Sequence, residues 1–168
     1  MIQPARPALA SAPSGSALTV LSFACTQIVL ARGDLRTIET ATDVVRVDPP
    51  QNAVGWIAAF DRVWPAFALS ADMAPLPEVP AGRRLCAVIG CRWGLFGLLC
   101  DEIQVVDEAS PSFVPLPALM RGPASPFRAV AKSEKGIVFA SDAEALARHI
   151  GAEAVLVKGL PTGGRIAA

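Results

Sequence analysis

Short apolar runs rich in Val and Ile recur along the chain, and Gly, Pro or Asp interrupts each of them. Runs of this length between turn residues are typical of β-strands. Strands are predicted at 19–24, 28–31, 35–40, 54–60 and 63–69, and again at 85–91, 95–100, 103–106, 127–132 and 136–140. Neither group alternates strands with helices, which argues against a parallel α/β fold. The pattern predicts a mainly β protein of two small five-stranded barrels or sandwiches.

A proline-rich segment at 70–83 separates the two groups of strands and predicts a crossover. A short helix is predicted near the C-terminus, because Ser141 can cap it, Glu144 follows three residues later and Gly151 can end it. A weaker helical or turn segment is predicted at 116–121.

We therefore expect a single domain over 17–150. It would contain a first barrel at about 17–70, the crossover, and a second barrel with the closing helix at about 84–150. Residues 1–16 consist largely of Pro, Ala and Ser and are expected to form a disordered tail, and 151–168 a C-terminal tail.

The charge content limits the classes of partner. Charged residues make up 18% of the chain, and fifteen Lys and Arg balance fifteen Asp and Glu. A neutral chain lacks the basic excess that is typical of proteins bound to nucleic acid or to anionic membranes. A charge-poor exterior instead favours a protein partner.

The longest apolar stretch, residues 17–31, contains four polar side chains and is shorter than the roughly 20 residues of a membrane-spanning helix. The segment before it has one Arg and three Pro, which is a poor match to a secretory signal. The four cysteines form no Cys-x-x-Cys pair, so buried reduced thiols in a cytoplasmic protein are expected.

No constellation of residues points to catalysis. The chain lacks the common nucleotide-binding, hydrolase and metalloprotease motifs. His149 is the single histidine, so a zinc site is not expected. Cys100 precedes two carboxylates, whose charges raise the pKa of a thiol and disfavour a nucleophile. The carboxylates form two sequential pairs, at 101–102 and 107–108. Adjacent side chains of a strand point to opposite faces, so the two members of a pair cannot easily share a proton. We expect no enzyme, no cofactor and no metal.

Aromatic and basic side chains have simple structural interpretations. Trp56 and Trp64 lie in neighbouring predicted strands, where packing is favoured and exposure of one as a partner anchor is the alternative. Trp93 falls in the predicted turn at 92–94. Arg83 and Arg84 open a strand and are interpreted as its solvated start.

Several motifs follow one another in a fixed order. The segment VGWIAAFDRVWPAFAL carries Val54, Gly55, Ile57, Pro65 and Leu69, and Arg84 opens the next apolar strand. The segments at 97–103 (GLLCDEI), 115–117 (PLP), 127–130 and 136–138 come next, and then Asp142. In their order and spacing these motifs resemble the CheW-like domain, the coupling module of bacterial chemotaxis.

The resemblance implies two intertwined five-stranded, SH3-like barrels with a groove between them and no catalysis. It implies two partners, the CheW-like regulatory domain of a histidine kinase and the cytoplasmic tip of a chemoreceptor. Nucleic-acid binding and membrane insertion are not expected. The alternative is a divergent β-barrel regulatory or small-ligand-binding module outside chemotaxis.

The chain departs from the family at one turn. Where the family has Asn-Leu-Arg-Gly, Phe60 replaces the Arg and Asp61 the Gly, and Thr37 replaces the Glu that opposes the Arg. Ala68 replaces a nearby Asp. Losing both members of an ion pair together can be nearly neutral for stability. We therefore expect a normal fold with a more apolar surface on the first barrel.

The resemblance marks seven candidate partner-binding residues, and packing in the core is the alternative for each of them. They are Val54, Gly55, Ile57, Phe60, Trp64, Leu99 and Ile103.

Overall fold

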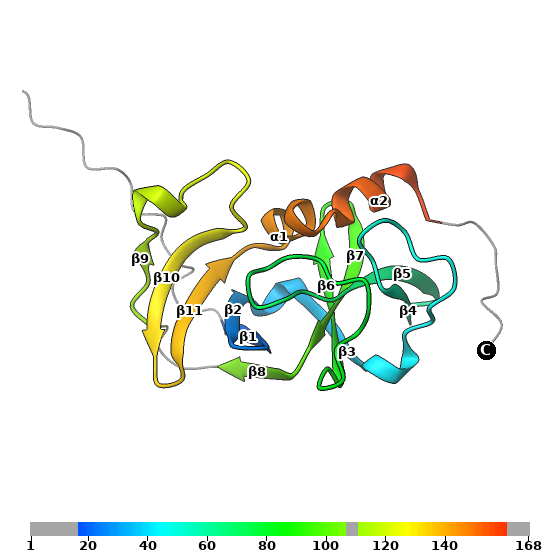
Figure 1. Cartoon of the computed structure of the whole chain (residues 1–168), viewed down its shortest axis with the longest axis horizontal. Helices are drawn as coiled ribbons and strands as arrows, with labels where there is room; N and C mark the ends of the chain where they lie inside the picture. The colour runs from blue at the N-terminus through cyan, green and yellow to red at the C-terminus, as the bar shows by residue number, and fades with distance from the viewer. Residues whose placement is uncertain (1–16, 107–110, 161–168) are drawn as a thin grey trace, which may run out of the picture.

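The computed structural model describes residues 17–106 and 111–160. They form two curled sheets, with two short helices packed across one side of the molecule (Figure 1). One sheet has six strands in the order β8-β1-β2-β11-β10-β9, and the other has five in the order β3-β6-β7-β5-β4. The strands are β1 Leu18–Phe23, β2 Thr26–Ala31, β3 Leu35–Thr40, β4 Gly55–Ala59, β5 Arg62–Phe67, β6 Leu85–Cys91, β7 Gly94–Cys100, β8 Glu102–Val106, β9 Val114–Pro115, β10 Phe127–Ser133 and β11 Gly136–Ser141. Single 3-10 turns follow β2, β3 and β9 at η1 Arg32–Asp34, η2 Ala41–Asp43 and η3 Ala118–Met120.

The mainly β prediction is confirmed, and each of the ten predicted strands overlaps an observed one. The strand that the pattern missed, β9, has two residues, one of them proline. β6 and β7 lie in the middle of their sheet and are buried on both faces, which explains their unbroken apolar sequences. The apolar stretch at 17–31 forms the β1–β2 hairpin. Among the described helices, none has the length and apolar character needed to cross a membrane.

The two sheets are interleaved along the chain. β1 and β2 join β8 and β11 in the six-stranded sheet, whereas β3 to β7 build the five-stranded one. The expected ranges 17–70 and 84–150 therefore each contribute strands to both sheets. An apolar pattern locates strands but does not reveal which distant strands pair.

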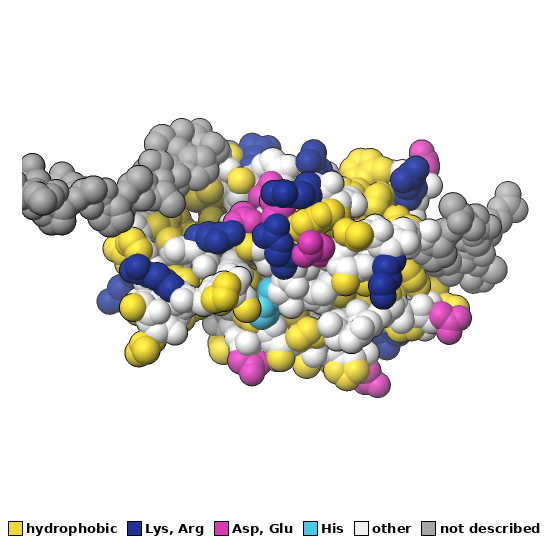
Figure 2. All heavy atoms as spheres, turned by 90° about the horizontal axis from the view of Figure 1, so that it is seen from above, with side chains coloured by type: hydrophobic (Ala, Val, Ile, Leu, Met, Phe, Trp, Pro, Cys, Tyr) yellow, Lys and Arg dark blue, Asp and Glu magenta, His cyan; other side chains and the backbone are white. Residues whose placement is uncertain are grey.

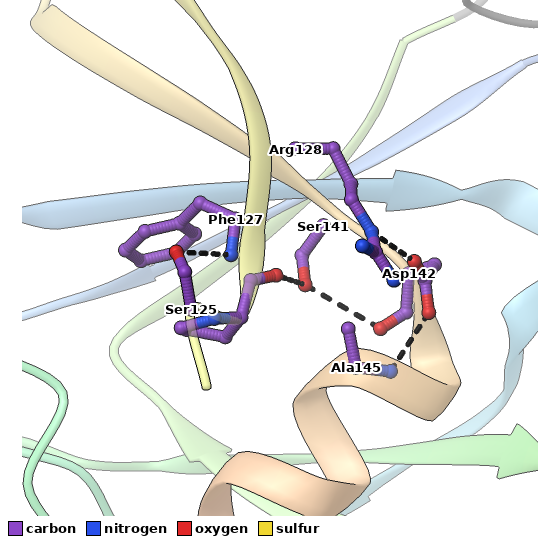
Figure 3. Close-up of polar contacts among 7 residues, drawn as sticks. Ser125, Phe127, Arg128, Ser141, Asp142 and Ala145 are labelled. Atoms are coloured by element: carbon purple, nitrogen blue, oxygen red, sulfur yellow. Dashed lines mark hydrogen bonds and ion pairs between the residues drawn. The ribbon is translucent and has the colours of Figure 1, made fainter. Parts of the chain in front are cut away.

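α1 (Ala143–Ile150) covers the junction of the sheets and begins at a cap different from the predicted one. Asp142 accepts a hydrogen bond from the Ala145 N–H at 2.7 Å, and its other oxygen accepts one from Arg128 Nε of β10 at 2.8 Å (Figure 3). The Ser141 hydroxyl donates to the Pro126 carbonyl instead. A carboxylate fits this position because it satisfies free N–H groups of the first turn. Gly151 ends α1 with φ 85°, as predicted.

A second helix follows where a tail was expected. α2 (Ala152–Lys158) starts directly after Gly151, and its Ala152 and Leu156 are buried. The apolar spacing of these two residues, four apart, is the helical signal that the sequence contained. The predicted tails at 1–16 and 161–168 and the carboxylate pair at 107–108 lie outside the described residues.

Arg83 is buried, which corrects its interpretation as a solvated strand start; its exposed fraction is 6%. Its two terminal nitrogens donate to the carbonyls of Leu69 at 2.7 Å and Leu99 at 3.2 Å. Its Nε lies 3.2 Å from Asp101 Oδ1, and the other oxygen of Asp101 accepts the Ala24 N–H at 2.6 Å. One guanidinium thus joins the ends of β5 and β7 and, through Asp101, the β1–β2 turn.

Two carboxylates near the first turn of α1 have opposite electrostatic environments. Burial raises the pKa of Asp34, and the charges of Glu144 and Asp142 raise it further against the opposing effect of Arg36. Burial also acts to raise the pKa of Asp142, but the hydrogen bond from Ala145 N–H and the Arg128 guanidinium lower it overall.

These shifts predict stability changes of opposite sign. The folded state binds the Asp34 proton more tightly than the unfolded state, so the favourable contribution of Asp34 is present at low pH and is lost as pH rises through its folded pKa. Asp34→Asn should therefore raise the free energy of unfolding at pH 7, with a gain that vanishes below about pH 3.8. Asp142→Asn should lower it at pH 7, because the contribution of that carboxylate is lost only as pH falls.

Urea denaturation of both variants between pH 3 and 7 measures these effects. If Asp34→Asn were less stable than the wild type at pH 7, the raised pKa assigned to Asp34 in the folded state would be contradicted.

Candidate interaction surface

The structure divides the seven candidate partner-binding residues by exposure. Phe60 is 61% exposed, and Ile103 in β8 is half-buried. The other five belong to the core and have little surface to offer a partner: Val54, Gly55, Ile57, Trp64 and Leu99.

Phe60 and Asp61 form the two-residue turn between β4 and β5, since Ala59 pairs with Arg62. Both turn residues have positive φ, 53° for Phe60 and 60° for Asp61. A turn of this kind matches the twist of a hairpin but strongly prefers Asn and Gly. Phenylalanine in the left-handed region is a genuine conformational outlier.

The residues beneath the strained turn are buried and hydrogen-bonded. Trp64 is buried under the hairpin, and its Nε1 donates to the Ala59 carbonyl at 3.0 Å. Gly94 at the start of β7 has φ 142°, and a Cβ there would lie 2.9 Å from the Trp64 ring. Glycine at 94 therefore allows the indole to lie against the next hairpin.

A second turn lies beside the first. β5 and β7 run parallel with Ala66 opposite Gly97, so both strands begin at the same end of the sheet. The turn before β7 carries Trp93, which is half-buried between two guanidinium groups. The Cζ atoms of Arg92 and Arg148 lie 5.4 Å and 5.1 Å from its ring centroid. We call Phe60, Arg62, Arg92 and Trp93 the hairpin-tip surface.

The side of the molecule that carries the helices is electrostatically mixed. Figure 2 shows Lys and Arg side chains intermingled there with Asp and Glu, and hydrophobic side chains between them. Arg148 is paired with Glu153 at 3.5 Å, and Glu144 accepts the Arg92 backbone N–H at 3.1 Å.

A second apolar surface lies on the outer strands of the six-stranded sheet. Val114, Val130 and Phe139 face one another across β9, β10 and β11, and Ile137 lies on the same face two residues before Phe139. Val114 and Ile137 are 54% and 58% exposed. We call these four residues the ribbon surface. β9–β11 and β4–β5 lie at opposite ends of the molecule (Figure 1).

The expected apolar surface around the replaced family residues is present only in part. Phe60 is exposed, whereas Trp64 and Ala68 are buried and Thr37 is half-buried. The resemblance located Phe60 because it drew attention to a missing Arg. It did not locate Arg92 and Trp93, whose place beside Phe60 depends on the pairing of β5 with β7, distant in sequence.

Cys91, Cys100 and the histidine form structural hydrogen bonds. Burial, with a contribution from Glu39, raises the pKa of Cys86 to about 12, and burial also raises that of Cys100. The Cys100 thiol donates to a carbonyl of its own strand, and His149 Nε2 lies 2.8 Å from the Met73 carbonyl. Four buried thiols were expected; Cys86 and Cys100 are buried, whereas Cys91 is half-buried and Cys25 is exposed.

A cleft of about 510 Å³ lies between the loop at 50–52 and α2. Trp56, Asn52 and Lys158 are among the residues that line it. Its volume is in the range of small-molecule sites.

Neither a search against protein-family models nor one against curated protein sequences gives a match. Among solved structures, the chain is similar to the scaffolding protein TtCheW from Thermoanaerobacter tengcongensis, with a TM-score of 0.59. The alignment covers 76% of this chain and 88% of that protein at 15% identity. The fold is CheW-like. The CheW-like fold accounts for the two curled, barrel-like subdomains and their interleaved strands.

Proposed function

We propose that this protein is a non-enzymatic signalling adaptor that bridges the CheW-like regulatory domain of a histidine kinase and the cytoplasmic tip of a chemoreceptor. The observation that carries the proposal is the presence of exposed apolar side chains at opposite ends of a CheW-like fold, on the hairpin-tip surface and on the ribbon surface. A bridging protein needs two separate contact surfaces that can be occupied together.

The composition of the two surfaces supports different contacts. Phe60, Trp93 and the neighbouring arginines belong to the residue types that dominate protein–protein hot spots. The ribbon surface carries aliphatic and aromatic side chains, with the exposed Lys132 paired opposite Ile137, which suits the apolar stripe of an amphipathic helix. We assign the kinase domain to the hairpin-tip surface and the receptor helices to the ribbon surface. Both partners would be met in the cytoplasm.

Calorimetric titration with purified fragments tests the adaptor. The wild type should bind the CheW-like regulatory domain of a kinase encoded in the same genome, and separately the receptor tip, each with a micromolar dissociation constant. Size-exclusion chromatography of all three should yield a ternary complex. Failure to bind either fragment would contradict the proposal. Binding of the two fragments in competition with each other would contradict bridging.

The cleft beside α2 favours a second candidate function, a regulatory module that binds a small ligand. Lys158 is the charged side chain among its lining residues, so a ligand with an acidic or polar group would suit it. Thermal-shift screening of organic acids tests this candidate, and Lys158→Met should abolish any stabilisation found.

A further inference from the structure

We propose that the hairpin-tip surface docks on an acidic protein surface, with the Phe60 side chain entering an apolar pocket that carboxylates surround. This inference rests on the proposed adaptor function and specifies the chemistry of one of its partners.

Folding alone does not account for Phe60. Its φ of 53° is disfavoured for a large side chain with a Cβ, and its ring remains 61% exposed. An Asn at this position would relieve the backbone and leave no apolar ring in water. A residue that is unfavourable in both respects is expected where a contact outside the chain compensates for it.

The hairpin that carries Phe60 is held in place before any partner arrives. The Trp64 Nε1 bond to Ala59 fixes the last residue of β4, and Gly94 allows the adjoining turn to pack against the same indole. An anchor on a rigid hairpin loses little conformational entropy on binding, so most of its burial energy is available for affinity.

The charges around the ring define the partner. Arg62 and Arg92 are exposed, and among the described residues neither forms an ion pair. Arg148 is paired with Glu153, and two further acids lie at the surface: Asp61 in the turn itself, and Glu144, whose carboxylate accepts the Arg92 backbone N–H. Two guanidinium groups without an ion-pair partner, one of them over the Trp93 ring, lie at the same end of the sheet as Phe60 and complement Asp or Glu side chains around an apolar pocket.

The test compares two substitutions in the same turn, Phe60→Asn and Asp61→Asn, for binding to the kinase regulatory domain. Phe60→Asn should keep or raise the melting temperature, by at most roughly 2–4 °C, because the strain is relieved. It should nevertheless weaken binding at least about tenfold, because the anchor is gone. Asp61→Asn should tighten binding about two- to threefold, since it removes the like charge that faces an acidic partner.

A charge reversal completes the design. Arg92→Glu should weaken binding at least about fivefold at low salt, and the difference from the wild type should shrink at high ionic strength.

The outcomes separate the two proposals. Wild-type protein that binds neither the kinase domain nor the receptor tip overturns the adaptor function and this inference together. If the wild type binds the kinase domain and Phe60→Asn binds it within twofold, the adaptor function stands and this inference fails. A fall in melting temperature of more than roughly 5 °C for Phe60→Asn would show that the Phe60 ring stabilises the folded protein, and it would also overturn the inference. Tighter binding by Arg92→Glu would exclude an acidic partner.

Discussion

Arg83→Met should lower the free energy of unfolding by about 2–5 kcal/mol, because Arg83 is buried and donates to two buried carbonyls, while its ion-pair partner Asp101 is partly exposed. Methionine fills much of the same volume, so the loss would come from unsatisfied polar groups and not from a cavity. The substitution leaves the Leu69 and Leu99 carbonyls without their donors and Asp101 without its cation. Each buried acceptor left unpaired costs about 1–3 kcal/mol.

Urea denaturation of Arg83→Met beside Arg84→Met measures this effect. Arg84 is the adjacent residue and is exposed, so its replacement should change the free energy of unfolding by no more than about 0.5 kcal/mol. A loss below about 1 kcal/mol for Arg83→Met would mean that the three contacts contribute little and would contradict the role assigned to this side chain.

Gly55→Ala should cost about 2–3 kcal/mol, near the upper end for overpacking a closed site. A Cβ at this position would lie 2.5 Å from the Val45 carbonyl oxygen and 2.7 Å from a methyl group of Val44. The approach cannot relax easily, because Val45 and Trp56 exchange two backbone hydrogen bonds of 2.8 Å immediately beside it. Close packing of these two chain segments accounts for a glycine that the resemblance had placed in a binding site.

Gly33→Ala is the matched control for this substitution. Nothing lies within 4 Å of a Cβ at Gly33, so that variant should differ from the wild type by no more than about 0.5 kcal/mol. Thermal and urea unfolding of both variants gives the comparison. Equal stability of Gly55→Ala and the wild type would show that β4 can move away from residues 44–45.

The local part of the fold could be predicted because it depends on neighbouring residues. Short apolar runs between turn residues located β1 to β8 and the last hairpin, and Gly151 marked the end of α1. The pairing of β2 with β11 and of β5 with β7 joins residues far apart in the chain, and no local pattern encodes it. The burial of Arg83 follows from this long-range pairing and was missed for the same reason.

The exposure of the candidate binding residues could be predicted only in part. Phe60 was identified because a family turn had lost its arginine, and the structure adds that the ring is exposed on a strained backbone. Val54, Ile57 and Leu99 were proposed from the same alignment but are core residues. An apolar residue that aligns with a family position can either contact a partner or pack in the core, and the alignment does not distinguish the two. An aromatic residue at a turn position with positive φ does indicate exposure.

The interleaving of the two sheets has a consequence for synthesis. β1 and β2 leave the ribosome first, but β8 and β11, the strands that flank them in the finished sheet, follow about eighty or more residues later. A lone two-stranded hairpin is marginally stable in water, and both of its edges are open to other chains. The apolar strands β1 and β2 therefore remain exposed until β8 and β11 have been translated. We expect the six-stranded sheet to form only after translation of β11.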